Sequence, residues 1–488
     1  MASITIRLSQ DVIDQQQALG AAGSPYGSLD DLLGNADPAG YGLPDVALRS
    51  WNLDGSTLRV DYTQGVTETY IGFRPDDPNA SAGHATASAY ELRQAGAFKV
   101  TTSGLMNFDY ALGAEPVLET SNAGHLLNTL RIATEYATTS PDYDPVFGNV
   151  AFSLGGRLGI GPTGELNGLV DSITVQADKL LRHAGVEGRL VLDPALSNGM
   201  YGTVDGYVED YYDGSSVVIA GLGADANQVD DLGAVYTNAA VLGGSDVIDI
   251  ALPDRLPAAV TVRAGAGADR ITLKGGGGLL GVDAGDGDDV IVLAGGAHAV
   301  DGGSGLDIAR LAVARAAVNV TALKSAGGVT TGYTVTDAAG VAIQLANVER
   351  LVFGDTAYAL DIDGHGGQAY RLYQAAFART PDQGGLGFWI DALDRGQGVA
   401  NAAQGFIDSN EYRAAYGAAT SHRELVNKYY ENILHRAPDA GGLDFWTGVL
   451  DSHGASVAQV LAAISESTEN REGTAALIGN GFAYTPWG

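Results

Sequence analysis

Five short turns in the middle of the sequence combine glycine and aspartate at a spacing that could hold a metal ion. In each turn an aspartate stands two residues after a glycine, as in Gly267-Ala-Asp269. Successive aspartates of this set are 21, 23, 20 and 18 residues apart. Four of the five turns add a glycine two residues earlier, which gives the pattern GxGxD. The five glycine–aspartate pairs are Gly223 and Asp225, Gly244 and Asp246, Gly267 and Asp269, Gly287 and Asp289, and Gly305 and Asp307; the four added glycines are Gly221, Gly265, Gly285 and Gly303.

This pattern favours calcium as the ligand. Calcium prefers about six to eight hard oxygen atoms, which aspartate carboxylates and the carbonyls of glycine turns supply. Glycine adopts positive-φ turns without steric cost, and a cation would neutralise stacked carboxylates that otherwise repel. The alternative is a glycine-rich solenoid with solvated surface aspartates, which also explains the irregular turns at Asp225 and Asp246. The expected calcium sites comprise Gly265, Gly267, Asp269, Gly285, Gly287, Asp289, Gly303, Gly305 and Asp307, with Asp225 and Asp246 as further candidates.

The turns resemble the RTX nonapeptide family, whose repeat is GGxGxDxUx with a large aliphatic residue at U. Ile248, Ile271 and Ile291 occupy the U position, whereas Ala309 departs from it. The resemblance implies a parallel β-roll that binds calcium between turns stacked on one edge and none on the opposite edge. It also implies export by a type I secretion apparatus that reads an uncleaved C-terminal signal.

Composition restricts the partners. The 488-residue chain has a formal net charge of −31, which disfavours nucleic acid and anionic membrane surfaces as partners but attracts divalent cations. Its 45% hydrophobic and 17% charged residues are typical of folded domains, and it has no cysteine to form disulfides or zinc–thiolate sites. We expect no membrane span and no cleavable Sec signal, because the sequence lacks both a run of 18 apolar residues and a basic, apolar leader.

The pattern of predicted strands and helices around these turns indicates a multidomain, mainly β protein with five parts. Residues 1–147 form an N-terminal mixed or β domain, in which the segment 124–137 is predicted to be an amphipathic helix. A β-rich repeat region follows, because the segments 167–175 and 201–209 resemble each other. The remaining parts are the calcium-binding β-roll, a β cap and a helical domain. The predicted boundaries are 1–147, 148–215, 216–312, 313–362 and 363–488.

The helical domain contains a duplication, because residues 373–389 match residues 430–446 at an offset of 57. Each copy reads helix, RxPD turn, helix. Pro381 and Pro438 are predicted at the first helical position, with Asp382 and Asp439 where the helix dipole favours an anion. The duplicated RxPDxxGLxxW pattern resembles a family of unassigned function that is common at the C-termini of secreted and surface-layer bacterial proteins.

Arg379 and Arg436 are expected to fix these turns, and Trp389 and Trp446 to anchor the packing. At the domain's entrance, Asp361 and Asp363 are expected to hold another cation, or Asp363 to cap the first helix.

The sequence offers no persuasive catalytic motif. It has no GxSxG elbow, no HExxH and no phosphate-binding loop, and its eight histidines are scattered. We therefore expect a non-enzymatic, secreted or cell-surface protein that depends on calcium and self-assembles into a sheet or filament, as part of a surface layer or extracellular matrix. The alternatives are an adhesin that binds cell-surface carbohydrates through residues 1–215, and a secreted hydrolase.

Overall fold

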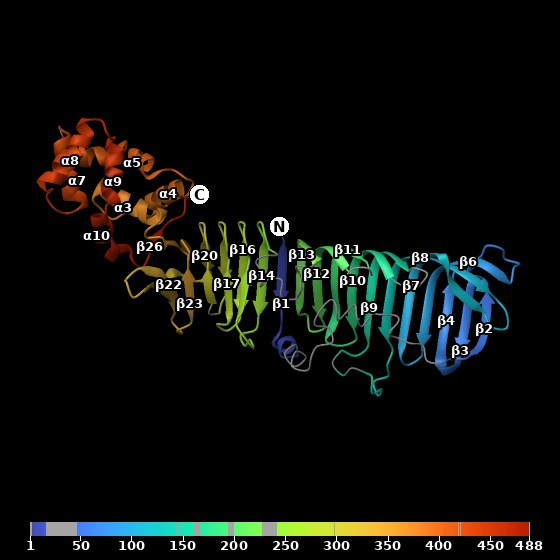
Figure 1. Cartoon of the computed structure of the whole chain (residues 1–488). Coiled ribbons are helices and arrows are strands. Elements are labelled where there is room, and N and C mark those ends of the chain that lie inside the picture. The colour runs from blue at the N-terminus through green and yellow to red at the C-terminus, as the bar shows by residue number, and fades with distance from the viewer. Residues whose placement is uncertain are drawn as a thin grey trace. The chain divides into compact units, whose positions relative to one another are not determined.

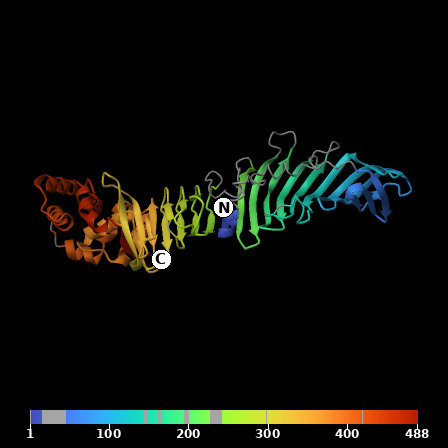
Figure 2. The ribbon, with the colours of Figure 1, turned by 90° about the horizontal axis from the view of Figure 1, so that it is seen from below.

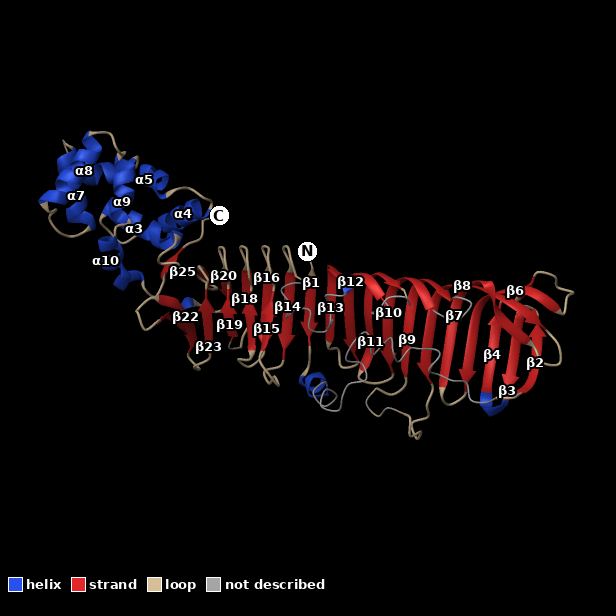
Figure 3. Ribbon diagram, viewed as in Figure 1, coloured by secondary structure: helices blue, strands red, loops and turns tan. Residues whose placement is uncertain are grey.

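The computed structural model describes residues 2–15, 46–143, 145, 147–160, 166–193, 200–226, 242–296, 298–417, 419 and 421–487. The chain divides into two compact units, Met1–Pro257 and Ala258–Gly488. Strands fill the first unit, and the second combines strands with a C-terminal set of helices (Figure 3). The structure is therefore mainly β with a C-terminal helical region. No helix among the described residues is long and apolar enough to cross a membrane.

From β2 to β13, unit 1 forms an antiparallel sheet in which strands close together in the chain also lie side by side (Figures 1 and 2). β8 pairs with β9, so the sheet continues across the boundary predicted at residue 147. The strands are β1 (Ser3–Arg7), β2 (Leu48–Asp54), β3 (Thr57–Tyr62), β4 (Val66–Ile71), β5 (Arg74–Pro75), β6 (Ala82–Gln94), β7 (Phe98–Ala111), β8 (Val117–Thr134), β9 (Val150–Ile160), β10 (Leu166–Ala177), β11 (Leu181–Leu192), β12 (Met200–Tyr211), β13 (Ser216–Asp225) and β14 (Val247–Leu252), with a short 3-10 turn at Thr63–Gly65.

The first strand closes unit 1 through contacts that are distant in sequence. β1 pairs antiparallel with β13 and parallel with β14, so it lies between them (Figure 1). Its Ile4 and Ile6 are fully buried. The pairing thus joins residues about 240 positions apart, as shown by the hydrogen bond between the Ala2 amide and the Asp246 carboxylate.

The long strands of unit 1 contain β-bulges, and some of their glycines lie in close contact with the neighbouring strand. Pairing shifts register within the β9–β10, β11–β12 and β12–β13 pairs. Gly168 and Gly202 have φ of +120° and +132°, and a Cβ on either would overlap a carbonyl oxygen of the neighbouring strand, that of Arg157 or Arg189. These glycines lie in the two segments whose similarity predicted a repeat. The repeat therefore corresponds to β10 and β12 of a single sheet, and each copy has a register shift a few residues after this glycine, between Val170 and Ser172 and between Val204 and Gly206.

The helix predicted for residues 124–137 is wrong, because most of this segment belongs to β8. Leu127, Leu130 and Ile132 are buried, whereas Leu126 is 55% exposed. The register shift between Leu127 and Thr129 separates two buried positions by three residues instead of two. A bulge therefore produced a spacing that resembles a helical period.

Unit 2 begins with short strands that alternate between two parallel ladders. β15 (Val260–Arg263), β17 (Leu280–Asp283), β19 (His298–Asp301) and β23 (Ala342–Ala346) form one ladder. β16 (Arg270–Gly275), β18 (Val290–Leu293), β20 (Ile308–Leu311) and β24 (Arg350–Val352) form the other. Between the ladders lie buried aliphatic side chains such as Val262, Ile271 and Leu280.

Antiparallel strands complete both ladders. β21 (Val318–Lys324) and β22 (Thr330–Asp337), which follow a 3-10 turn at Arg315–Ala317, extend the first ladder through β23. β25 (Ala357–Ala359) and the C-terminal β26 (Phe482–Tyr484) extend the second. The end of the chain is therefore hydrogen-bonded to the segment that precedes the helices.

The described helical region consists of two series of four helices, and the first three helices of each series match in length to within one residue. Offsetting the first series by 57 residues gives the starts of α7 and α8, and those of α9 and α10 within one residue. The helices are α3 (His365–Phe377), α4 (Gln383–Asp394), α5 (Val399–Ile407), α6 (Asn410–Tyr416), α7 (His422–Ile433), α8 (Ala440–Asp451), α9 (Val457–Ser465) and α10 (Thr468–Ile478). The duplication thus describes a repeated structural unit.

Candidate metal centre

The GxGxD turns of unit 2 stack on one another between the two ladders. The Asp286 amide donates to the Gly265 carbonyl at 2.9 Å, and the Ser304 amide donates to the Gly285 carbonyl at 2.8 Å. The glycines at the turns have positive φ, as in Gly287 at +133°. A Cβ on Gly287 would overlap the Gly267 carbonyl oxygen of the preceding turn, so this close stacking requires glycine.

The three aspartates of these turns form a column. A carboxylate oxygen of Asp289 accepts from the Asp269 amide at 2.7 Å, and one of Asp307 accepts from the Asp289 amide at 3.0 Å. The three residues are at most 2% exposed. The structure therefore brings Asp269, Asp289 and Asp307 to equivalent positions in successive turns, as their spacing predicts.

The column leaves carboxylate oxygens that its own hydrogen bonds do not satisfy. The second carboxylate oxygens of Asp289 and Asp307 are buried and have no hydrogen-bond partner in the described structure. A buried acceptor without a partner costs about 1–3 kcal/mol, and more if it carries charge. A cation or a proton would remove this cost.

The pKa shifts of these carboxylates also indicate that the column lacks a positive charge. Burial raises the pKa of Asp289. Burial, with smaller contributions from the charges of Asp289, Glu349 and Asp288, raises the pKa of Asp307 to about 7. Without a cation, the buried carboxylate of Asp307 is therefore held partly protonated near neutral pH.

Glu349 extends the column and was missed from the sequence. Its carboxylate accepts from the Asp307 amide at 2.8 Å, which is the position that an aspartate of a fourth turn would take. Burial also raises the pKa of Glu349. Glu349 lies 42 positions after Asp307, and the inserted strands β21 and β22 hide the repeat period.

The donor set fits calcium. The carboxylates of Asp269, Asp289, Asp307 and Glu349 are hard oxygen donors on successive turns, and the carbonyls of Gly267 and Gly287 face the next turn closely. Among the described residues, no group of three or more His, Asp or Glu side chains gathers in the way that a side-chain metal cage would. Any ion in the column would therefore depend on one carboxylate per turn together with backbone carbonyls.

The two irregular turns lie elsewhere. Asp225 is the last residue of β13 and pairs with Thr203 in the antiparallel sheet of unit 1. Asp246 is 2% exposed and precedes β14, where its carboxylate accepts from the Ala2 amide. The stacking seen in unit 2 is therefore not the setting of Asp225, and Asp246 is engaged by the N-terminal segment.

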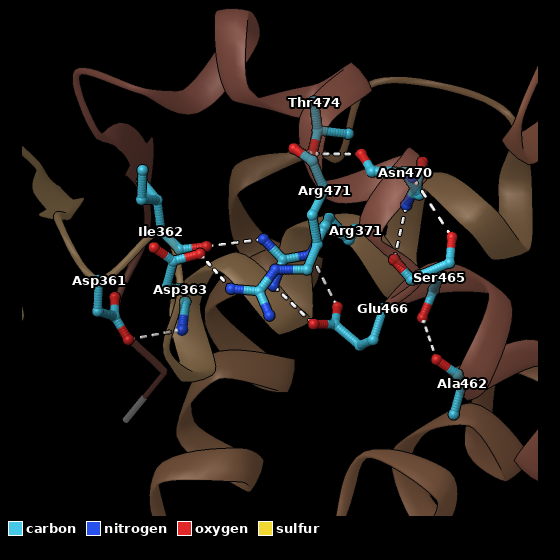
Figure 4. A network of polar contacts seen from close by, with 12 residues as sticks. Asp361, Ile362, Asp363, Arg371, Ala462, Ser465, Glu466, Asn470, Arg471 and Thr474 are labelled. Atoms are coloured by element: carbon cyan, nitrogen blue, oxygen red, sulfur yellow. Dashed lines mark hydrogen bonds and ion pairs between the residues drawn. The ribbon is translucent and has the colours of Figure 1, made fainter. Parts of the chain in front are cut away.

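Asp361 and Asp363 are engaged by arginines. The Asp361 carboxylate contacts the Arg350 guanidinium and accepts from the Gly366 amide at 2.8 Å. Asp363 pairs with Arg471 (Figure 4). The N-cap of α3 is Gly364, so the interpretation of Asp363 as the N-cap is wrong. The Asp361 side chain takes the capping role instead.

The buried side chain of Arg371 also holds the segment around Asp361 and Asp363 in place. Arg371 on α3 is 2% exposed and donates to both carboxylate oxygens of Glu466 at 2.8 and 2.7 Å. It also donates to the Ile362 carbonyl at 2.7 Å (Figure 4). The segment that contains Asp361 and Asp363 is thus held against α3 and α9 by protein contacts.

The aspartates of the RxPD turns lie at helix N-termini as predicted, but the prolines do not. Asp382 and Asp439 are N-caps whose carboxylates accept from the Gly385 and Gly442 amides at 2.7 and 2.8 Å. The helices α4 and α8 begin at Gln383 and Ala440, so the prolines precede the caps and do not occupy the first helical position.

Arginines and tryptophans support these turns. Arg379 pairs with Glu411 and Arg436 with Glu469, and each donates to the carbonyl of the next residue at 3.2 Å. Trp389 stacks on Phe406 with ring centroids 4.4 Å apart, and Trp446 is partly buried against the helical core.

Comparison with known protein families identifies this helical region. Residues 368–413 and 403–473 match a family model described as "Domain of unknown function (DUF4214)". No curated protein sequence matches the chain.

Proposed function

We propose that the protein is a secreted, calcium-dependent structural protein that assembles into a bacterial surface layer or extracellular matrix. In this proposal the alternating ladders of unit 2 form a parallel β-roll of the RTX type that calcium stabilises. The observation that carries the proposal is the buried column of Asp269, Asp289 and Asp307, in which two carboxylate oxygens lack partners.

Calcium would change the stability of this column in a simple way. The carboxylates of Asp289, Asp307 and Glu349 repel one another when ionised, and the ion supplies the opposing charge. A ligand that binds only the folded state contributes about 1.4 kcal/mol per site at 10 times its dissociation constant, which is about 1 mM calcium for an affinity of about 10⁻⁴ M. With affinities of about 10⁻⁴–10⁻³ M, such sites would be empty in the cytoplasm and filled outside the cell. The polypeptide would thus pass through a type I secretion apparatus unfolded in this region and fold after export.

Self-assembly follows from the surface charge. A chain with a formal net charge of −31 repels its own copies until cations bind between them. We therefore expect ordered sheets or filaments to form only when calcium is present.

A chelator series tests this proposal. The purified full chain is titrated with calcium after exhaustive chelation, and circular dichroism, light scattering and electron microscopy are recorded at each step. We expect strand content and particle size to rise together over the submillimolar to millimolar range. Magnesium at the same ionic strength is the control. A spectrum and a particle size that are identical in excess chelator and in millimolar calcium would refute the proposal.

A second candidate is a carbohydrate-binding adhesin. A cavity of about 330 Å³ in unit 1 is lined by hydrogen-bonding side chains and an aromatic ring, among them Arg131, Asn149, Gln176 and Tyr212. Such groups suit sugar hydroxyls and a sugar-ring face. Glycan-array binding that disappears in Gln176→Ala, but not in a variant of unit 2, would favour this function over self-assembly.

A further inference from the structure

The last turn of the column is joined to the helical region by two consecutive residues. The Glu349 carboxylate accepts from the Asp307 amide at 2.8 Å, inside the column. The amides of Glu349 and Arg350 both donate to the Asp307 carbonyl, at 3.1 and 3.0 Å. The backbone contacts that place Glu349 in the column therefore also place Arg350.

The Arg350 side chain leaves the column and reaches two carboxylates at the ends of helices. One guanidinium nitrogen contacts Asp361, and another donates to both carboxylate oxygens of Asp394 at 2.8 and 2.9 Å. Asp361 accepts from the Gly366 amide in the first turn of α3, and Asp394 is the last residue of α4. A single guanidinium thus ties β24 to the start of α3 and to the end of α4.

These contacts are buried and depend on the position of the arginine. The side chains of Arg350, Asp361 and Asp394 are 2%, 9% and 14% exposed. A planar guanidinium has its donors in a fixed arrangement, so it meets two carboxylates only while its own backbone stays in place. A buried carboxylate that loses its cation is left uncompensated, which is strongly unfavourable. A displacement of Arg350 should therefore loosen both helix ends.

The last turn is the place where such a displacement should arise in the absence of a cation. One buried carboxylate oxygen of Asp307 has no hydrogen-bond partner in the described structure. Asp307 and Glu349 contact each other and repel when both are ionised. Separation of the two residues relieves this repulsion, but it also takes the Asp307 carbonyl away from the Arg350 amide.

We propose that the last turn, when calcium compensates Asp307 and Glu349, fixes the ends of α3 and α4 through Arg350, which acts as a positioning residue. This inference rests on the calcium binding proposed above and assigns a regulation to that site. The helical region is then held firmly against the ladders only when the column is filled. Because coupling between two sites is reciprocal, the contacts of Arg350 with α3 and α4 in turn raise the calcium affinity of the last turn.

Hydrogen-exchange mass spectrometry of the full chain, in excess chelator and in millimolar calcium, tests the coupling. The peptides to follow cover the column at residues 264–312, the end of α4 at residues 388–397 and the end of α8 at residues 445–454. The end of α8 is the internal control, because it has the same place in the duplicated unit but its Asp451 pairs with His422. We expect calcium to slow exchange at the end of α4 by about fivefold or more, and to change the end of α8 much less.

Variants assign the effect to the two joining residues. Glu349→Gln keeps an acceptor for the Asp307 amide without the charge, so the end of α4 should no longer respond to calcium while residues 264–290 still do. Glu469→Gln is the matched control, because it makes the same change at a carboxylate that is 46% exposed in the second copy. Arg350→Lys keeps the charge but not the planar fork, so the end of α4 should lose its protection in calcium while the column still responds.

The outcomes separate this inference from the calcium proposal. Protection of residues 264–312 by calcium with no change at the end of α4, or with the same change in Glu349→Gln as in the wild type, overturns the coupling and leaves calcium binding intact. An equal response at the ends of α4 and α8 also overturns it, because the effect is then not transmitted through Arg350. An absent response at residues 264–312 refutes the calcium proposal itself, and the coupling with it.

Discussion

The buried carboxylate of Asp307 should make the calcium-free protein less stable as pH rises, and Asp307→Asn should remove this dependence. Burial raises the pKa of Asp307 to about 7, compared with about 4 in an unfolded chain. The folded state therefore binds more protons than the unfolded state between these values. The contribution of Asp307 to the free energy of unfolding is fully present below about pH 4 and is lost as pH rises towards about pH 7.

The magnitude follows from the shift. Three pKa units correspond to about 4 kcal/mol, and screening by water at the turn surface reduces this to about 2 kcal/mol. In Asp307→Asn the side chain keeps its shape and its acceptor for the Asp289 amide but does not titrate. At pH 7.5 without calcium, the variant should be more stable than the wild type by about 2 kcal/mol.

Calcium should reverse this order. The ion requires ionised carboxylates, so it should stabilise the wild type most at pH 7.5 and the Asn variant less. Hydrogen-exchange mass spectrometry of peptides that cover residues 264–312, recorded with and without calcium at pH 5.5 and 7.5, measures the effect where it arises. Asp444→Asn serves as the exposed control. An equal pH slope in wild type and Asp307→Asn, or an order of stabilities that calcium leaves unchanged, would refute the reasoning.

Three further changes test the packing. Gly287→Ala should lower the free energy of unfolding by more than about 2 kcal/mol, because its Cβ would overlap the Gly267 carbonyl. Gly340 also has positive φ but open surroundings, so Gly340→Ala should cost about 1 kcal/mol. Thermal melts compare the two variants. Arg350→Met should cost about 3–5 kcal/mol in calorimetry, because it leaves Asp361 and Asp394 buried without their cation, and a melting temperature close to that of the wild type would contradict the role of this pair. Asp439→Ala should lower the midpoint of urea denaturation through loss of the α8 cap, with Asp444→Ala on the same helix expected to leave it unchanged.

The stacked turns could be predicted from the sequence because a parallel ladder repeats its geometry at a fixed interval. The spacings of 20 and 18 residues place Asp269, Asp289 and Asp307 in register, and Ile271 and Ile291 pair directly. The helices were predictable for a related reason, because the duplication marks equivalent caps at Asp382 and Asp439.

Features that depend on distant contacts were not predictable. Glu349 joins the column only after an insertion, and Arg350 pairs with Asp394, which lies in a different domain of the predicted scheme. The bulge in β8 disturbs a strand alternation in a way that local sequence cannot reveal. In each case the partner that determines the residue's role lies tens of residues away.

The position of β1 has a consequence for how unit 1 is completed. Strands β2 to β13 pair with strands close to them in sequence and can form hairpin by hairpin, whereas β1 must wait for β13 and β14. Until it arrives, both strands present unpaired edges, which are templates for the same segment of another molecule. A chain that lacks residues 2–8 should therefore accept a synthetic peptide of that sequence, or exchange N-terminal strands with intact neighbours, so that molecules become linked through donated strands.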